Sequence, residues 1–196
     1  MVNIGAFNER ICVLKFIKAE NTIWRWMQIA EIWAKPERKS GKSLFSSLGL
    51  GADSFKFIIR KRPISLHHAV LWRDHHYTIT DIVDLNDGTL EITAAKTKLT
   101  DCVYVYTPVT KNERNNPVYG VPHTVAFPGI LTEIYYKYAR DERAYNDVSM
   151  LLVTPKPIAL RTGGIVRTEQ ASFTVHAVHA VDLYKNEYEI AQRRDA

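Results

Sequence analysis

Short runs of alternating apolar and polar residues fill this chain, and most of the apolar residues in them are β-branched or aromatic. From Phe55 to Arg60, for example, Phe55, Phe57 and Ile59 would share one side of an extended chain, with Lys56 on the other. This pattern predicts β-strands. In the first half we expect strands over residues 10–16, 27–34, 55–60, 69–72, 77–83 and 89–95. In the second half we expect them over residues 102–106, 148–153, 164–167, 172–181 and 187–191.

Three segments between these strands have patterns of their own. Asn86-Asp87-Gly88 predicts a tight hairpin turn, because asparagine, aspartate and glycine tolerate positive φ at little cost. Apolar residues at helical spacing predict one helix over residues 131–145. Residues 107–122 are rich in proline and asparagine, and we expect a long loop there. Closely spaced strands with so little helix predict an all-β fold.

The second half of the chain repeats landmarks of the first half in the same order. The matched segments are Arg62–Leu66 with Lys156–Leu160, Tyr77–Ile79 with Phe173–Val175, Val83–Leu85 with Val181–Leu183, and Leu90–Ile92 with Tyr188–Ile190. The offset between the copies drifts only from 94 to 98 residues, about the size of one small domain. We therefore predict two tandem small β-barrel domains, residues 1–99 and 100–196, with the helix inserted in the second. Chance similarity between two unrelated β-rich halves is the alternative.

Positive charge is concentrated in the first half of the chain. The 196 residues have a formal net charge of +5. Residues 1–100 contain 15 lysines and arginines against 10 acidic residues, whereas the rest contain 11 of each. The excess gathers in residues 35–42 and 56–62, on either side of a segment rich in glycine and serine. Such runs can attract a polyanion through sequence-independent phosphate contacts, and a solvated charged face is the alternative.

Cysteine usage and hydropathy indicate where the protein folds. Cys12 and Cys102 are too few and too far apart in sequence for a disulfide framework or a zinc site, so we expect buried thiols in a reducing compartment. No stretch approaches the roughly 20 apolar residues of a membrane span, and the N-terminus lacks the pattern of a secretion signal. We expect folding in the cytoplasm, without a membrane partner.

No residue pattern in the chain points to catalysis. The sequence from Lys39 to Ser43 ends like a phosphate-binding loop, but Pro36 stands where the earlier glycine is required. The histidine pairs at 67–68 and 75–76 would face opposite sides of a strand, which prevents either pair from chelating one ion. We expect no metal site, no cofactor and no catalytic residues, although catalytic groups that converge only in space leave no motif.

The segment from Ser40 to Asp53 is a candidate for interaction with a partner. It is too long for a tight hairpin and rich in glycine and serine, yet it contains Leu44, Phe45, Leu48 and Leu50, which a solvated loop would not need. Loops with apolar side chains usually contact another subunit or a ligand. The alternative is that these residues fold over the core of their own domain.

Several segments of the first half occur in an order and spacing that are found together in one family. They are Ile4-Gly5, Asn8–Ile11, Ile29–Ala34, Lys39–Lys42, Phe57–Arg60 with Arg62–Ile64, and Tyr77–Ile82. Together they resemble the head-tail connector family of tailed bacteriophages, the stopper or head-closure proteins that lie below the portal. The resemblance covers about residues 1–99. Typical members have one domain, so the resemblance implies no role for residues 100–196.

The resemblance implies a small β-barrel that assembles into a ring on the axis of the virion, with the loop over residues 40–53 directed toward the DNA channel. The channel residues that it implies are Lys35, Arg38, Lys39, Ser40, Gly41, Lys42, Leu44, Phe45, Leu48 and Lys56. The implied partners are a portal or adaptor ring, tail proteins, other copies of the chain, and packaged DNA bound non-specifically. Six copies would present twelve barrels to a portal of twelve subunits. The alternative is that the second domain lies outside the ring as a collar or tail-docking module, and a ring of twelve full chains would exclude the symmetry matching.

We therefore expect a non-enzymatic structural protein of the virion neck, assembled in the host cytoplasm, that joins head to tail and closes or lines the DNA channel. A tail-completion protein of the same neck is the nearest alternative. A nucleic-acid-binding β-barrel is another, with Trp24, Trp26 and Trp33 as surfaces on which bases stack. Burial of Trp24 and Trp26 in a core would explain that pair equally.

Overall fold

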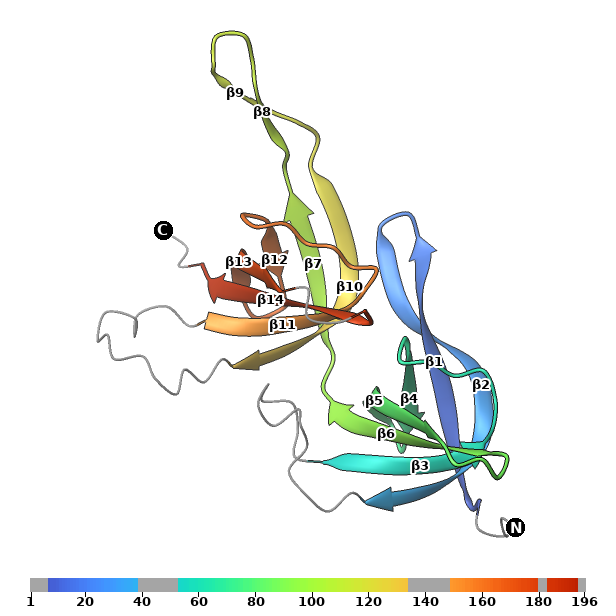
Figure 1. Ribbon diagram of the computed structural model, residues 1–196. Helices are drawn as coiled ribbons and strands as arrows, with labels where there is room; N and C mark the ends of the chain where they lie inside the picture. The colour runs from blue at the N-terminus through green and yellow to red at the C-terminus, as the bar shows by residue number, and fades with distance from the viewer. Residues whose placement is uncertain (1–6, 39–52, 134–148, 180–182, 194–196) are drawn as a thin grey trace. The chain divides into compact units, whose positions relative to one another are not determined.

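The computed structural model describes residues 7–38, 53–133, 149–179 and 183–193, and in these ranges the protein is all-β (Figure 1). The strands form one mixed sheet of 12 strands and a separate two-stranded hairpin. The predicted all-β class is confirmed. No helix occurs in the described ranges, and so none there is long and apolar enough to cross a membrane.

The chain divides into two compact units. Unit 1 comprises Met1–Ile17 and Trp26–Leu99, and unit 2 comprises Lys18–Arg25 and Thr100–Ala196. The first six strands are β1 (Glu9–Glu20), β2 (Ile23–Arg38), β3 (Ser54–Arg60), β4 (His68–Trp72), β5 (His75–Asp84) and β6 (Thr89–Thr97). The other eight are β7 (Thr100–Tyr106), β8 (Val109–Lys111), β9 (Pro117–Tyr119), β10 (His123–Glu133), β11 (Ser149–Pro155), β12 (Ile165–Arg167), β13 (Ser172–His179) and β14 (Lys185–Gln192).

The strands of the two units pair in the same order. In the first set the order is β1-β4-β5-β6-β3-β2, and β2 pairs back with β1. In the second set the order is β7-β12-β13-β14-β11-β10, and β10 pairs back with β7. Each set of six strands therefore pairs in a closed cycle. The strands of one set correspond one to one, in chain order, to the strands of the other set. Within unit 2, Ile23 also pairs with Ala126 in parallel, which makes the sheet mixed.

The registers of the two sets correspond as well. Phe57 lies opposite Ile92 in unit 1, and Leu152 lies opposite Tyr188 at the corresponding place in unit 2. The sequence comparison had instead matched Ile92 with Ile190, two residues further on. That match was wrong in register because residues two apart on a strand face the same side and share its apolar or polar character.

A β-bulge interrupts the same strand in both units. In β5 the register shifts between Ile79 and Asp81, and in β13 it shifts between Val175 and Ala177. A bulge adds one residue to one strand and increases the local twist. Before the bulges, Ile79 and Val175 are both buried, so the two strands present the same face to their cores.

Aromatic rings fill the core of unit 1. Phe57 is fully buried, and its ring centroid lies 5.5 Å from that of Trp72 and 5.7 Å from that of Tyr77. Both pairs are close to perpendicular, the edge-to-face arrangement that aromatic quadrupoles favour. Phe55 adds a further edge-to-face contact with Trp72 at 5.0 Å.

In the core of unit 2, polar side chains hold the segment Lys156–Leu160 in place. The Asn186 amide donates hydrogen bonds to the carbonyls of Lys156 and Ile158, at 3.0 and 2.8 Å. The Tyr188 hydroxyl donates to the Ile158 carbonyl at 2.7 Å and accepts from the Leu160 amide at 3.1 Å. Ile158 and Leu160 are consequently buried, at 2% and 5% exposure.

Tyr104 anchors the end of the same segment. Its hydroxyl accepts a hydrogen bond from the Arg161 amide at 3.0 Å. The ring reaches this position because residue 164 is glycine: a Cβ there would lie 2.3 Å from the Tyr104 ring. Burial raises the pKa of both Tyr104 and Tyr188, so both hydroxyls keep their protons at neutral pH.

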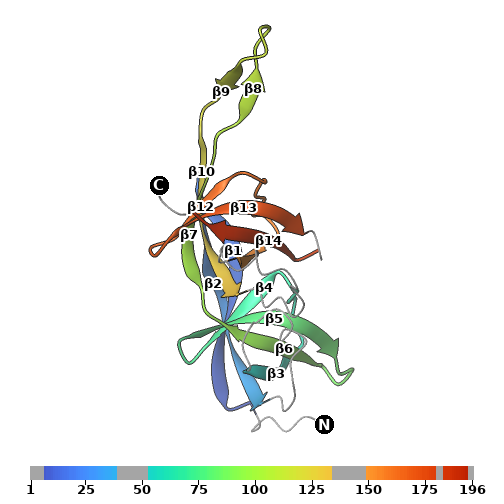
Figure 2. The same cartoon turned by 90° about the vertical axis from the view of Figure 1, so that its left-hand side faces the viewer.

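Two segments differ from the sequence predictions. Residues 131–133 form the end of β10, where Leu131 pairs with Leu152, so pairing with β11 outweighs the helical spacing there. The rest of the predicted helix, residues 134–148, lies outside the described residues. The predicted loop over 107–122 contains the hairpin β8–β9, which extends beyond β7 and β10 as a two-stranded arm (Figures 1 and 2).

The asparagines that suggested a loop form the turn of this hairpin. The Asn112 side chain accepts hydrogen bonds from the amides of Arg114 and Asn116, at 3.0 and 2.9 Å. Asn115 has a positive φ of 61°. The predicted turn at residues 86–88 is confirmed, with positive φ at Asn86 and Gly88.

Candidate functional site

Most of the residues predicted to line a DNA channel lie outside the described residues. These are Lys39, Ser40, Gly41, Lys42, Leu44, Phe45 and Leu48. The structure describes the other three, and each of them has an acidic partner. Lys35 lies 2.6 Å from Glu37, Arg38 lies 3.1 Å from Asp53, and Lys56 lies 2.7 Å from Glu91.

These three pairs reduce the positive field that the sequence suggested. The hydrogen bond to Glu91 raises the pKa of Lys56, which keeps the ammonium group charged but neutralised locally. Lys61 is likewise paired, with Asp84. Among the described basic residues of the second run, only Arg60 and Arg62 have no acidic side chain within ion-pair distance. Unbalanced positive charge is therefore confined to two arginines there.

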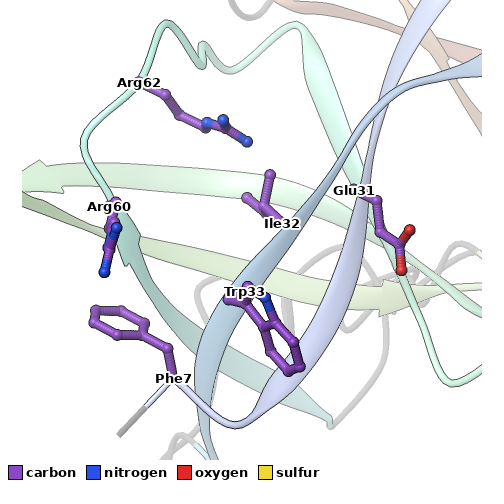
Figure 3. A pocket seen from close by; sticks show the side chains of 6 residues that line it. All are labelled: Phe7, Glu31, Ile32, Trp33, Arg60 and Arg62. Carbon is purple, nitrogen blue, oxygen red and sulfur yellow. The ribbon is translucent and has the colours of Figure 1, made fainter. Parts of the chain in front are cut away.

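Both of these arginines line a pocket on unit 1 (Figure 3). The pocket has a volume of about 500 Å³ and is lined by Phe7, Glu31, Ile32, Trp33, Arg60 and Arg62. This volume lies within the range of small-molecule sites. In the view of Figure 3, Arg60 lies beside Phe7, and Trp33 lies between Arg60 and Glu31.

The pocket forms where β3 separates from β2. The ladder between these strands ends at the pair Ala34–Ile59, and β3 itself ends at Arg60. The chain then turns away, and the Lys61 amide donates a hydrogen bond to the Gly88 carbonyl at 2.9 Å. Trp33 and the residues before it in β2 thus have no pairing with β3, and Arg60 and Arg62 border the space left between the two segments.

The walls of the pocket combine aromatic and cationic groups. Trp33 is 51% exposed, and the Arg10 guanidinium lies 4.6 Å from its ring centroid, a cation–π contact. Arg10 also lies 3.3 Å from the Glu31 carboxylate, which neutralises the acidic group in the pocket. The local charge that remains is that of Arg60 and Arg62.

Alternation along β2 explains why Trp33 points outward. Ile32 and Ala34 are buried, so the residue between them faces the other side. Trp26 has the opposite parity and packs inward, with ring centroids 5.1 Å from both Phe16 and His76. Of the three tryptophans proposed as stacking surfaces, Trp33 is the exposed one, and Trp24 and Trp26 are partly buried.

No protein-family model matches this chain, and no curated protein matches it. The function of the pocket is therefore inferred from its own side chains. The repeat supplies one internal comparison. By register, Pro128 of β10 corresponds to Trp33, and Pro155 of β11 corresponds to Arg60. Unit 2 thus lacks both the aromatic surface and the first of the two arginines at the corresponding place.

Two buried groups in the cores are titratable but do not form a site. His76 lies 2.8 Å from the Thr97 hydroxyl, and burial lowers its pKa to about 4. Burial raises the pKa of the Cys102 thiol to about 11, and Cys12 is half-buried. Neither cysteine forms a disulfide. Within the described part of the chain, no group of three or more His, Cys, Asp or Glu side chains could hold a metal ion.

The pocket could not be recognised from the sequence because its chemistry depends on which basic residues find acidic partners. Arg60 and Arg62 belong to the same run as Lys56 and Lys61, and nothing in the run distinguishes the paired residues from the unpaired ones. One available signal was the alternation around Trp33, which places this side chain opposite the buried Ile32.

Proposed function

We propose that this protein is a structural component of the neck of a tailed bacteriophage, without enzymatic activity. In this proposal it assembles into a ring of six or twelve copies below the portal, contacts a portal or adaptor ring on one side and tail proteins on the other, and closes or lines the DNA channel. A tail-completion protein of the same neck is the neighbouring alternative.

The strand pairing supports the proposal. The resemblance to head-tail connectors implies a small β-barrel, and a barrel requires strands that pair in a closed cycle. Each set of six strands has such a cycle, closed by β2 with β1 and by β10 with β7. We infer that each unit is a small barrel and that the chain carries two of them.

The observation that carries the proposal is the amount of apolar side chain left on the surface. Along β2, Met27 and Ile29 are 43% and 45% exposed, on the same side as Trp33. On and beside the arm β8–β9, Tyr119 and Val121 are 70% and 79% exposed. Apolar side chains that cluster on a surface often mark contacts with other proteins. A ring buries such surfaces through a heterologous contact that repeats until it closes.

Native mass spectrometry and negative-stain electron microscopy of the purified full chain, with and without portal particles, test this proposal. We expect a closed ring of six or twelve copies, formed alone or on the portal. The double variant Met27→Ser, Ile29→Ser should shift the population toward smaller species. The variant Lys98→Gln, at an exposed residue between β6 and β7, should assemble like the original chain.

A chain that remains monomeric with portal particles present, at every concentration measured, would contradict the ring. Assembly that is equally strong in the serine variant would exclude the β2 face as the contact but leave the ring in place. The second candidate, a nucleic-acid-binding barrel, is favoured by one specific observation. The exposed Trp33 lies at the same pocket as two arginines that have no acidic partner among the residues that the structure describes.

A further inference from the structure

We propose that the pocket between β2 and β3 binds single-stranded nucleic acid, with a base stacked on Trp33 and a phosphate group held by Arg60 and Arg62. The described residues of this site do not belong to the predicted channel loop, and the proposed binding does not require ring assembly. The described residues that line the pocket are Phe7, Glu31, Ile32, Trp33, Arg60 and Arg62.

The charge of the pocket calls for an anionic ligand. Arg60 and Arg62 have no acidic partner among the described residues, whereas the nearby Lys61 is paired with Asp84. Glu31, the carboxylate among the described residues that line the pocket, is paired with Arg10 at 3.3 Å. A guanidinium group presents a planar set of donors that matches a phosphate group, and two such groups at one pocket favour a phosphate over a neutral ligand.

The aromatic wall of the pocket suits a flat ring. Arg10 lies over the Trp33 ring at 4.6 Å, and the ring remains half exposed. Figure 3 shows the Phe7 ring on the same side of β2 as Arg60. Stacking of a base on an exposed aromatic side chain is sequence-tolerant, because every base has a π-face. The apolar floor is supplied by Ile32, which is buried.

A single-stranded nucleic acid fits this combination better than an acidic protein segment. Each nucleotide carries one flat ring and one phosphate, so any register along the strand presents both groups to the pocket. A peptide presents a carboxylate only where an acidic residue occurs. The volume of about 500 Å³ is also sufficient for one nucleotide. A base paired in a duplex would not have a free face for Trp33.

The test measures binding of fluorescein-labelled octathymidylate to the full chain by fluorescence anisotropy, at several salt concentrations. We expect Arg60→Gln and Arg62→Gln each to weaken binding about tenfold, because each removes charge-assisted hydrogen bonds to phosphate. Trp33→Ala should weaken it by roughly five- to a hundredfold, and Trp33→Phe should retain most of the affinity. Lys98→Gln removes the same charge from an exposed site elsewhere and should change the affinity less than about twofold.

Three competitor arms identify the ligand class: inorganic phosphate, an eight-base-pair duplex and a polyglutamate peptide. The proposal predicts that phosphate competes weakly and that the duplex binds less tightly than the single strand. It is overturned if octathymidylate does not bind, or if it binds with the same affinity to the two arginine variants. It is also overturned if the duplex binds as tightly, or if polyglutamate alone shows the dependence on Arg60 and Arg62.

Ring assembly is scored separately on the same samples by native mass spectrometry. Loss of octathymidylate binding in a chain that still assembles would contradict the nucleotide pocket only. Retained binding in a chain that does not assemble would contradict the neck proposal only.

Discussion

The two units share one order of strands but hold the segment that follows β3 or β11 in different ways. In unit 2, Asn186 and Tyr188 of β14 bind the backbone of Lys156–Leu160 and bury Ile158 and Leu160. By register, the corresponding residues in β6 of unit 1 are Leu90 and Ile92. Neither has a hydrogen-bonding side chain, so this anchor is absent from unit 1.

The consequence is visible at the corresponding segment of unit 1. Ile64 and Leu66 are only partly buried, and Arg62 at the start of the segment is exposed and lines the pocket. The segment that follows the corresponding strand is therefore closed and hydrogen-bonded in unit 2 and borders a cavity in unit 1. A few polar residues on one neighbouring strand decide between the two outcomes.

The largest effect should come from the aromatic cluster around Phe57 in the core of unit 1, a position that Leu152 occupies in unit 2. Phe57→Ala removes a fully buried ring that contacts Trp72 and Tyr77, and should lower the free energy of unfolding by about 3–5 kcal/mol. Urea denaturation followed by tryptophan fluorescence measures it. Ile29→Ala, at an exposed position, is the control and should cost much less. A loss below about 1 kcal/mol for Phe57→Ala would show that the cluster contributes little to stability.

Acid should destabilise unit 1 through His76, whose counterpart by register in unit 2 is Ser172. Burial lowers its pKa to about 4 in the folded chain, from the ordinary histidine value of about 6.5, so between these pH values the unfolded state holds the extra proton. Stability is therefore full above pH 6.5 and declines as pH falls toward 4, by about 3 kcal/mol in total.

Denaturation curves between pH 4 and 7 measure this loss. His76→Phe should flatten the pH dependence, because a phenyl ring cannot take up the proton. His75→Gln changes an exposed histidine and should leave the slope as it is. An unchanged slope in His76→Phe would assign the acid sensitivity to other groups.

Replacing the polar anchor should make unit 2 resemble unit 1. Asn186→Leu introduces the residue that corresponds to Leu90, removes two hydrogen bonds and should cost about 1–3 kcal/mol. Hydrogen exchange at the amides of Leu160 and Arg161 should accelerate as their segment loosens. Gln192→Leu on the exposed end of the same strand is the matched control. Unaltered exchange in Asn186→Leu would mean that Tyr188 and Tyr104 hold the segment without the Asn186 side chain.

The smallest effect should come from the basic residues that have acidic partners. Arg38 is exposed beside Asp53, and exposed ion pairs contribute less than about 1 kcal/mol. Arg38→Gln should therefore leave thermal unfolding nearly unchanged and should not alter octathymidylate binding. An effect on binding as large as that of Arg62→Gln would remove the distinction between paired and unpaired basic residues.

Local pattern was sufficient for most strands because their apolar residues alternate and their turns contain asparagine and glycine. It was insufficient for β10, which contains Pro128 and Gly129, two residues that normally interrupt a strand. Glycine fits here without a clash, whereas a Cβ at residue 129 would lie only 2.7 Å from the Leu152 side chain. Close packing against β11 favours glycine at this position, and a sequence shows no such neighbour.

The candidate site was less predictable than the fold. The excess of basic residues in 35–62 predicted a strongly positive surface. Ion pairs between residues far apart in the sequence neutralise much of that charge. Arg38 and Asp53 are 15 positions apart, and Lys56 and Glu91 are 35 apart. Which cations remain unpaired depends on strand pairing, and local sequence does not encode that information.

The bulges in β5 and β13 carry a historical consequence if the two halves descend from a single ancestral unit. An inserted residue at the same place in both copies is most simply a trait that predates the copying event. The ancestor would then have possessed the extra residue already, whereas the two copies came to differ at the pocket arginines and at the Asn186 anchor after the copying event.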